Sequence, residues 1–168
     1  MKKEEIYQWL EEQGIPYEVT EHPAVITMED LEAIEWPYPN SNGKNLFVRD
    51  DKKRNYYLIT VKNDKRVDLK EFRNEHGTRR LSFASAEELK ERLGLEQGAV
   101  SPLGLINDTT HSVHFYFDRA FLKGTGMLGV HPNDNTATVW LKAEDLIALV
   151  EKLGNPVHVV AIDSPELF

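Results

Sequence analysis

The sequence predicts a mixed α+β domain built around one β-sheet. Segments with strand-like alternation are interspersed with segments of helical periodicity, the connections are short, and two adjacent strands have the pattern of a hairpin. The chain has 168 residues, of which 40% are hydrophobic and 29% charged, as expected for a soluble protein with a sizeable core. We therefore expect a single domain over residues 1–168.

The N-terminal part predicts two helices and a strand. Residues 3–13 carry apolar side chains at helical spacing, and Gly14 stands where a helix C-terminal cap is common. Residues 15–22 alternate between apolar and polar side chains, as a half-buried strand does. A short helix is expected over residues 27–34, with acidic residues in its first turn. Residues 36–43 predict a loop whose two aromatic rings could form a pocket wall or cover the core.

A hairpin and a further helix follow. Residues 44–50 and 55–61 are rich in apolar and aromatic side chains, and they predict antiparallel strands joined by the polar turn 51–54. Residues 68–75 have a short helical pattern, and residues 80–83 predict a short strand.

The second half of the chain continues the alternation of helices and strands. A helix over residues 85–93 begins at Ser85, where the sequence Ser-Ala-Glu-Glu is typical of a capping box. The remaining expected elements are strands over 113–117, 136–141 and 157–161, a helix over 143–152, and a turn or short helix over 118–122.

Composition excludes several classes of protein. The absence of cysteine excludes disulfides, thiolate zinc sites and a cysteine nucleophile. No apolar run approaches the roughly 20 residues that a membrane helix needs, and the charged N-terminus leads directly into a helix without the apolar core of a signal peptide. We therefore expect a cytoplasmic protein with no membrane partner.

The charge distribution argues against bulk binding of nucleic acid and leaves room for a local site. The net charge is −8, whereas proteins that coat DNA are usually basic. More than half of the lysines and arginines nevertheless lie between residues 44 and 80. They could form one positive face, although solvated lysines around hairpin turns give the same pattern.

One loop, residues 98–104, links the helix over 85–93 to the strand over 113–117. Its sequence, Gly-Ala-Val-Ser-Pro-Leu-Gly, restricts the backbone without supplying a strong acid, base or nucleophile. Such a loop acts through its backbone amides, which can hold a phosphate, a carboxylate or a developing oxyanion. The alternative is a tight connection with no chemical role.

The side chains offer no familiar catalytic signature. His111 and His114 enter a predicted strand, where a spacing of three puts them on opposite faces, and we find no nucleophile elbow or Walker loop. We therefore expect no metal and no cofactor. Lys44 and Asn45 begin a strand directly after a glycine, where a lysine could place a positive charge beside a phosphate or carbonyl. A solvated lysine at a strand end explains the same residue.

Three motifs occur in the order and spacing of a known family: Lys44-Asn45-Leu46-Phe47-Val48-Arg49-Asp50, Gly98-Ala99-Val100-Ser101-Pro102, and residues 113–118. On these motifs the chain resembles the YbaK-type aminoacyl-tRNA deacylases, which include the editing insertion of bacterial prolyl-tRNA synthetase. The run Gly129-Val130-His131-Pro132-Asn133 is similar to that of free-standing members that hydrolyse alanine from proline tRNA. The resemblance implies a mixed, strongly curved central sheet surrounded by helices.

The resemblance also implies a reaction, a partner and a set of site residues. The substrate would be tRNA(Pro) carrying alanine at its acceptor end, and prolyl-tRNA synthetase is a candidate partner. Because the ester is already activated, a positioned water and a stabilised oxyanion suffice without a protein nucleophile. The implied roles are oxyanion donation by the amides of Gly98, Ala99, Val100 and Ser101, restraint of that loop by Pro102, binding of the terminal adenosine or its phosphate by Lys44, and lining of the aminoacyl pocket by Asn45 and His131.

Several alternatives stay open from the sequence. His131 could be a structural loop residue, and the pocket could clear cysteine, serine or threonine in place of alanine. The chain could also be a tRNA-binding or synthetase-associated module without activity, or a small-molecule binding protein. Lys44 and the complete loop favour the enzyme over these two alternatives.

Overall fold

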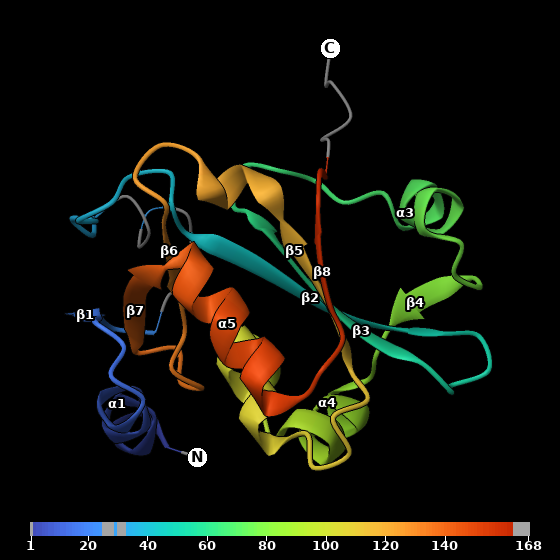
Figure 1. Ribbon diagram of the computed structural model, residues 1–168, viewed down its shortest axis with the longest axis horizontal. Coiled ribbons are helices and arrows are strands. Elements are labelled where there is room, and N and C mark those ends of the chain that lie inside the picture. The colour runs from blue at the N-terminus through green and yellow to red at the C-terminus, as the bar shows by residue number, and fades with distance from the viewer. Residues whose placement is uncertain (1, 25–28, 30–32, 163–168) are drawn as a thin grey trace.

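The computed structural model describes residues 2–24, 29 and 33–162 (Figure 1). The helix expected over residues 27–34 therefore lies largely outside the described residues. No helix in the described part of the chain is both long enough and apolar enough to span a membrane.

The strands form two sheets that meet at one bridge. The five-stranded sheet has the order β4 (Leu81–Phe83), β2 (Gly43–Asp50), β3 (Tyr56–Lys62), β5 (His114–Asp118) and β8 (Val157–Val160). The three-stranded sheet has the order β1 (Glu18–Glu21), β7 (Ala137–Lys142) and β6 (Met127–Val130). A bridge between Asn42 and Gly129 connects them.

Strand direction makes the larger sheet mixed. β4, β2 and β3 are antiparallel neighbours, whereas β3, β5 and β8 run parallel. The mixed α+β prediction is confirmed, and the expected sheet is divided into the two parts that flank the start of β2.

Helices cover both faces of the larger sheet. They are α1 (Lys3–Glu12), α3 (Leu69–His76), α4 (Ala86–Leu93) and α5 (Ala143–Leu153), with short 3₁₀ helices η1 (Gln97–Ala99), η2 (Pro102–Asn107) and η3 (Arg119–Leu122). Figure 1 shows α5 lying across the sheets, with α4 below it. α3 lies at the right of the view above β4, on the side away from α1 and β1. The main core combines the apolar faces of α1, α4 and α5 with Phe115 and Phe117, while Phe72 of α3 packs in a second cluster with Ile59 and Tyr116.

Local capping explains where the helices begin and end. Ser85 accepts a hydrogen bond from the amide of Glu88, and the Glu88 carboxylate accepts one from the Ser85 amide, so the predicted capping box is confirmed. Asp68 caps α3 in a related way by accepting from two amides. Gly94 ends α4 with φ +65°, a conformation in which a Cβ would be strained.

Three segments differ from their predictions. The strand expected over 15–22 is limited to residues 18–21, where it pairs with β7. The segment 98–104, expected as a plain loop, contains parts of η1 and η2, because Ser101 caps η2 and Pro102 favours its first turn. β6 was not predicted, although its three apolar side chains after a Gly-rich turn are a recognisable strand signal.

Candidate functional site

Two cavities lie beside the first residues of β2. The first, here called the Asn45 cavity, has a volume of about 270 Å³ and is lined by Asn45, Leu46, Phe47, Phe83, Ala84, Leu89, Gln97 and Val100. The second, the His131 cavity, has a volume of about 240 Å³ and is lined by Asn42, Gly43, Asn63, Gly129, Val130, His131 and Thr138. The predicted site residues Asn45 and His131 therefore line two separate cavities, which β2 borders through Asn45 and Gly43 respectively.

Thr60 of β3 lies opposite Asn45 in the hairpin. Its hydroxyl donates a hydrogen bond of 2.6 Å to the Asn45 Oδ1, which fixes the amide orientation. The Asn45 Nδ2 has no hydrogen-bond partner among the described residues, and it is not a fully buried atom. This amide is therefore free to donate to a bound molecule. A Cβ added at Gly43 would lie 3.2 Å from the Gly129 carbonyl oxygen, so the two sheets approach closely here because Gly43 has no side chain.

The segment 97–101 borders the Asn45 cavity through Gln97 and Val100. The Ala99 amide already donates to the Glu96 carbonyl. Of the four amides that the resemblance assigns to the oxyanion, that of Ala99 is therefore already engaged within the protein. Within the described residues, the amides of Gly98, Val100 and Ser101 have no hydrogen-bond partner in the protein.

Ser101 has a structural side chain. Its hydroxyl is completely buried and accepts a hydrogen bond of 3.1 Å from the Leu103 amide, which starts η2. Pro102 is also buried, at the first position of that 3₁₀ helix. The two residues hold the loop backbone in place, and a buried hydroxyl engaged in this way is unsuited to act as a nucleophile.

The loop that carries His131 touches the segment 97–101. A Cβ added at Gly98 would lie 3.2 Å from the Asn135 Nδ2, so the glycine permits this close contact. The tertiary structure thus brings together two loops that are more than thirty residues apart in the sequence.

His131 is a neutral hydrogen-bonding group. Its Nδ1 lies 3.1 Å from the Ala137 carbonyl oxygen, and because a carbonyl only accepts, Nδ1 carries the hydrogen. Burial lowers the pKa of His131; the hydrogen bond to Ala137 opposes this shift, and the nearby His22 adds to it. The Nε2 atom is therefore an acceptor, suited to a substrate ammonium or a water molecule.

The aromatic residues of the segment 36–43 cover the core. The ring centroids of Trp36 and Tyr38 lie 5.9 and 5.6 Å from that of the fully buried Trp140. Trp36 also contacts His22 edge-on, at 5.7 Å. Of the two interpretations that the sequence allowed, these contacts favour a cover over the core.

Lys44 lines neither cavity. It neighbours Asn45 on β2, and successive side chains on a strand point to opposite faces, so the lysine emerges on the other side of the sheet. Its Nζ lies 3.4 Å from the Lys65 carbonyl oxygen. Lys65 belongs to the turn after β3, which also contains Asn63, a residue of the His131 cavity.

The chain matches the family model for the aminoacyl-tRNA editing domain over residues 22–149. This match covers most of the chain and includes every residue of the candidate site. The chain belongs to the aminoacyl-tRNA editing domain family. This membership confirms the resemblance found in the sequence and the prediction of an editing enzyme.

Two relatives illustrate the membership. The chain is 41% identical over 160 residues to the prolyl-tRNA editing protein ProX of Acetoanaerobium sticklandii, covering 95% of this chain and 97% of the relative. It is 35% identical over 162 residues to the prolyl-tRNA synthetase associated domain-containing protein 1 of Mus musculus, covering 95% of each chain. Both alignments extend over nearly the whole length of the editing domain.

Solved structures share the fold. A crystal structure of a candidate trans-editing enzyme for prolyl-tRNA synthetase superimposes with a TM-score of 0.72 at 24% identity, covering 98% of this chain and 99% of the other. This likeness confirms the predicted editing-domain fold.

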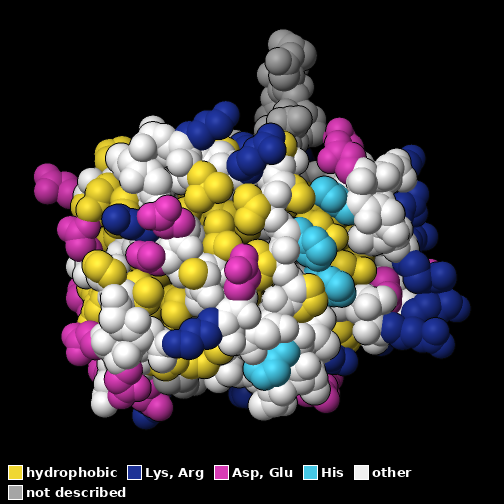
Figure 2. All heavy atoms as spheres, viewed as in Figure 1, with side chains coloured by type: hydrophobic (Ala, Val, Ile, Leu, Met, Phe, Trp, Pro, Cys, Tyr) yellow, Lys and Arg dark blue, Asp and Glu magenta, His cyan; other side chains and the backbone are white. Residues whose placement is uncertain are grey.

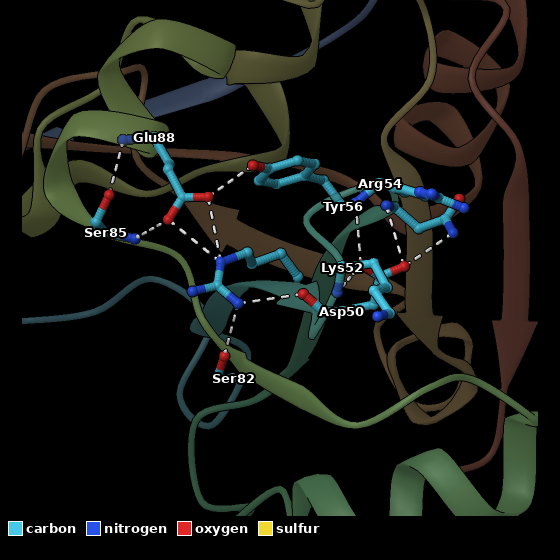
Figure 3. Close-up of polar contacts among 9 residues, drawn as sticks. Asp50, Lys52, Arg54, Tyr56, Ser82, Ser85 and Glu88 are labelled. Atoms are coloured by element: carbon cyan, nitrogen blue, oxygen red, sulfur yellow. Dashed lines mark hydrogen bonds and ion pairs between the residues drawn. The ribbon is translucent and has the colours of Figure 1, made fainter.

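The half-buried carboxylate of Glu88 anchors α4 of the editing domain to the sheet (Figure 3). Glu88 accepts hydrogen bonds from the Tyr56 hydroxyl at 2.6 Å and from the Ser85 amide at 3.0 Å, and the Arg49 Nε lies 3.2 Å from the carboxylate. Burial alone would raise the pKa of Glu88, but these hydrogen bonds outweigh it and lower the pKa to about 2. Arg92 adds a cation–π contact, 4.0 Å from the Tyr56 ring centroid. The network fixes the helix that leads into the segment 97–101.

Asp50 closes the adjacent hairpin, as Figure 3 also shows. Its carboxylate accepts hydrogen bonds from the amides of Lys52, Arg54 and Asn55. These bonds hold the turn between β2 and β3, the two strands that carry Asn45 and Thr60.

Three histidines meet away from the two cavities. His114 and His158 stack with their ring centroids 5.8 Å apart, and His76 lies 5.0 Å from Tyr116 in the same cluster. Figure 2 shows histidine side chains in a column on this face. Despite this convergence, the described residues contain no group of three or more His, Asp or Glu side chains that could hold a metal ion.

Charge is unevenly distributed over the editing domain. Figure 2 shows carboxylates along the edge that carries α1 and β1, and lysines and arginines gathered at the opposite edge, near β4 and the turn after β2. The basic residues concentrated between positions 44 and 80 thus contribute to a local positive region on an acidic protein.

Proposed function

We propose that this editing domain acts in trans on mischarged tRNA(Pro) and hydrolyses the ester of Ala-tRNA(Pro). The observation that carries the proposal is the set of unpaired amides at Gly98, Val100 and Ser101, in a loop that borders the Asn45 cavity. Backbone amides fixed in advance stabilise an oxyanion at no cost of reorganisation during the reaction. The unit that performs this reaction is the domain over residues 1–168.

The chemical step needs no protein nucleophile. A water molecule attacks the ester carbonyl, the carbonyl oxygen becomes an oxyanion held by the loop amides, and the ribose oxygen leaves with a proton. The free ribose hydroxyl next to the ester is a candidate for assisting the water. The buried, hydrogen-bonded Ser101 hydroxyl fits this assignment, because it is inaccessible for covalent catalysis.

Three side chains position the substrate in this proposal. The Lys44 ammonium binds the phosphate or the terminal adenosine, and its only polar contact among the described residues is a long one that a phosphate can replace. The free Nδ2 of Asn45 and the acceptor Nε2 of His131 line the aminoacyl pocket, where the acceptor receives the substrate ammonium. Each cavity contributes one of these two groups.

Selectivity for alanine over proline follows from size and from the amine. Alanine is smaller than proline, and a pocket rejects a larger side chain by steric clash. Proline carries a secondary amine, which offers fewer donors to His131. The ProX relative is named as a prolyl-tRNA editing protein, which supports tRNA(Pro) as the carrier.

The test is to incubate the protein with Ala-tRNA(Pro), Pro-tRNA(Pro) and Ala-tRNA(Ala), and to measure loss of the aminoacyl bond. Rapid release from the first and little from the second is expected. If tRNA(Pro) charged with cysteine, serine or threonine were hydrolysed in place of Ala-tRNA(Pro), the amino acid would be reassigned. No release from any mischarged tRNA would leave a binding module without activity. The reaction belongs in the cytoplasm with prolyl-tRNA synthetase, the enzyme whose errors it would correct.

A further inference from the structure

Phe83 is an exposed aromatic side chain at the edge of the candidate site. Its exposed fraction is 61%, higher than that of Leu122 at 43% or of any other large hydrophobic side chain among the described residues. It lies at the end of β4 and lines the Asn45 cavity together with Gln97 and Val100. An exposed phenylalanine contributes little to the core, so its position in a cavity wall suggests a contact with a ligand.

The neighbouring edge of β2 is open. β4 pairs with β2 only at Val48–Asp50, and the last link is the hydrogen bond from the Ala84 amide to the Phe47 carbonyl. Backbone groups alternate in direction along a strand, so the N–H and C=O of Asn45 point out of the same edge as those of Phe47. The Asn45 cavity therefore combines an aromatic ring with unpaired polar groups from Asn45.

We propose that the Phe83 ring stacks on the base of the 3′-terminal adenosine of the aminoacyl-tRNA, an inference that rests on the proposed function. Proteins recognise unpaired bases by stacking them on aromatic side chains and by hydrogen bonding at their edges. The terminal nucleoside carries the reacting ester, so its base lies within one nucleoside of the loop amides. Val100 and Phe83 line the same cavity, which allows one nucleoside to contact both the loop and the ring.

In this arrangement Phe83 positions the substrate and takes no part in the chemical step. Phe83→Ala should weaken binding of the 3′ end by about 5- to 150-fold, which is the range expected for removing one base–aromatic stack. Phe83→Trp should preserve binding, because it retains a ring, whereas Phe83→Leu should lose most of it although it remains apolar. On Ala-tRNA(Pro), the loss should appear mainly as a higher KM.

The deciding measurement is equilibrium binding of two tRNA(Pro) transcripts, one ending in CCA and one ending in CC. The wild type should bind the CCA transcript more tightly, and Phe83→Ala should remove this difference while leaving binding of the CC transcript unchanged. Leu122→Ala, which shortens another exposed apolar side chain away from both cavities, is the matched control and should behave as the wild type.

Two results would overturn the inference: equal weakening of both transcripts by Phe83→Ala, or no weakening of either. A wild type with equal affinity for both transcripts would also overturn it. Because the measurement reads binding alone, it separates this inference from the proposed function, which is tested by hydrolysis of Ala-tRNA(Pro).

Discussion

The Glu88 carboxylate should make the stability of this protein depend on pH in the acidic range. In the folded state its pKa is lowered to about 2, against an ordinary value of 4.5, by hydrogen bonds that outweigh the opposing effect of burial. A group whose pKa is lowered by folding stabilises the protein above its unfolded pKa, and that stabilisation is lost as the pH falls towards the folded pKa. The relevant window therefore runs from about pH 5 down to pH 2.

The size of the effect follows from the difference between the two pKa values. Each tenfold change in proton affinity corresponds to about 1.36 kcal/mol, so the full contribution is about 3 kcal/mol. The side chain is half-buried, with 17% of it exposed, and solvent screening makes this value an upper bound. Linkage gives a loss of roughly 1.4 kcal/mol by pH 3.5, where many domains are still folded.

The perturbation is Glu88→Gln, which keeps the shape and removes the charge. Urea unfolding at pH 7 and at pH 3.5 should show that the variant is less stable than the wild type at pH 7, and that this gap narrows by roughly 1.4 kcal/mol at pH 3.5. Glu87→Gln removes an exposed carboxylate from the same turn of α4 and is the matched control. A gap that stays the same at both pH values would refute the assignment of the network to a charged Glu88.

Four further predictions concern the site and its frame. Lys44→Ala and Lys44→Arg should both lower deacylation of Ala-tRNA(Pro) severely, because neither side chain replaces a compact ammonium. The urea midpoints of both variants should be unchanged. Wild-type rates of deacylation would show that the lysine is merely solvated. Gly98→Ala should fold, because its Cβ meets only the Asn135 side chain, at 3.2 Å. It should still slow hydrolysis, because the added Cβ shifts the loop amides. Full activity of this variant would remove the loop from the mechanism. Gly129→Ala places a Cβ 2.6 Å from a Trp140 ring carbon and should lower the free energy of unfolding by about 1–3 kcal/mol, measured with urea. An unchanged urea midpoint would contradict this close approach. Binding of tRNA should be weak and only moderately sensitive to salt, because the basic region is local, and a steep slope of log affinity against log salt would oppose this.

The sequence predicted the elements whose signals are local. The helix at 85–93 was found because Ser85 and Glu88 form a capping box within one turn, and the hairpin of β2 and β3 because its two strands are adjacent in the chain. The family also followed from the sequence, because its motifs are short runs of residues with fixed spacing. The segment at 98–102 was predicted to be functional in this way, although its 3₁₀ turns were not predicted.

Tertiary structure decided how these elements meet, since that depends on contacts between distant residues. The approach of Gly98 to Asn135 joins two loops, and the Ala99 amide is lost as a candidate donor because it bonds to Glu96. Nothing in the sequence placed Phe83 beside Asn45, because that contact depends on β4 ending where it does. The sequence alone therefore determined the family, the mixed α+β class and the residues that carry the motifs. Which backbone amides are free, and which side chains share a cavity, was decided only by the packing of the two sheets and their loops.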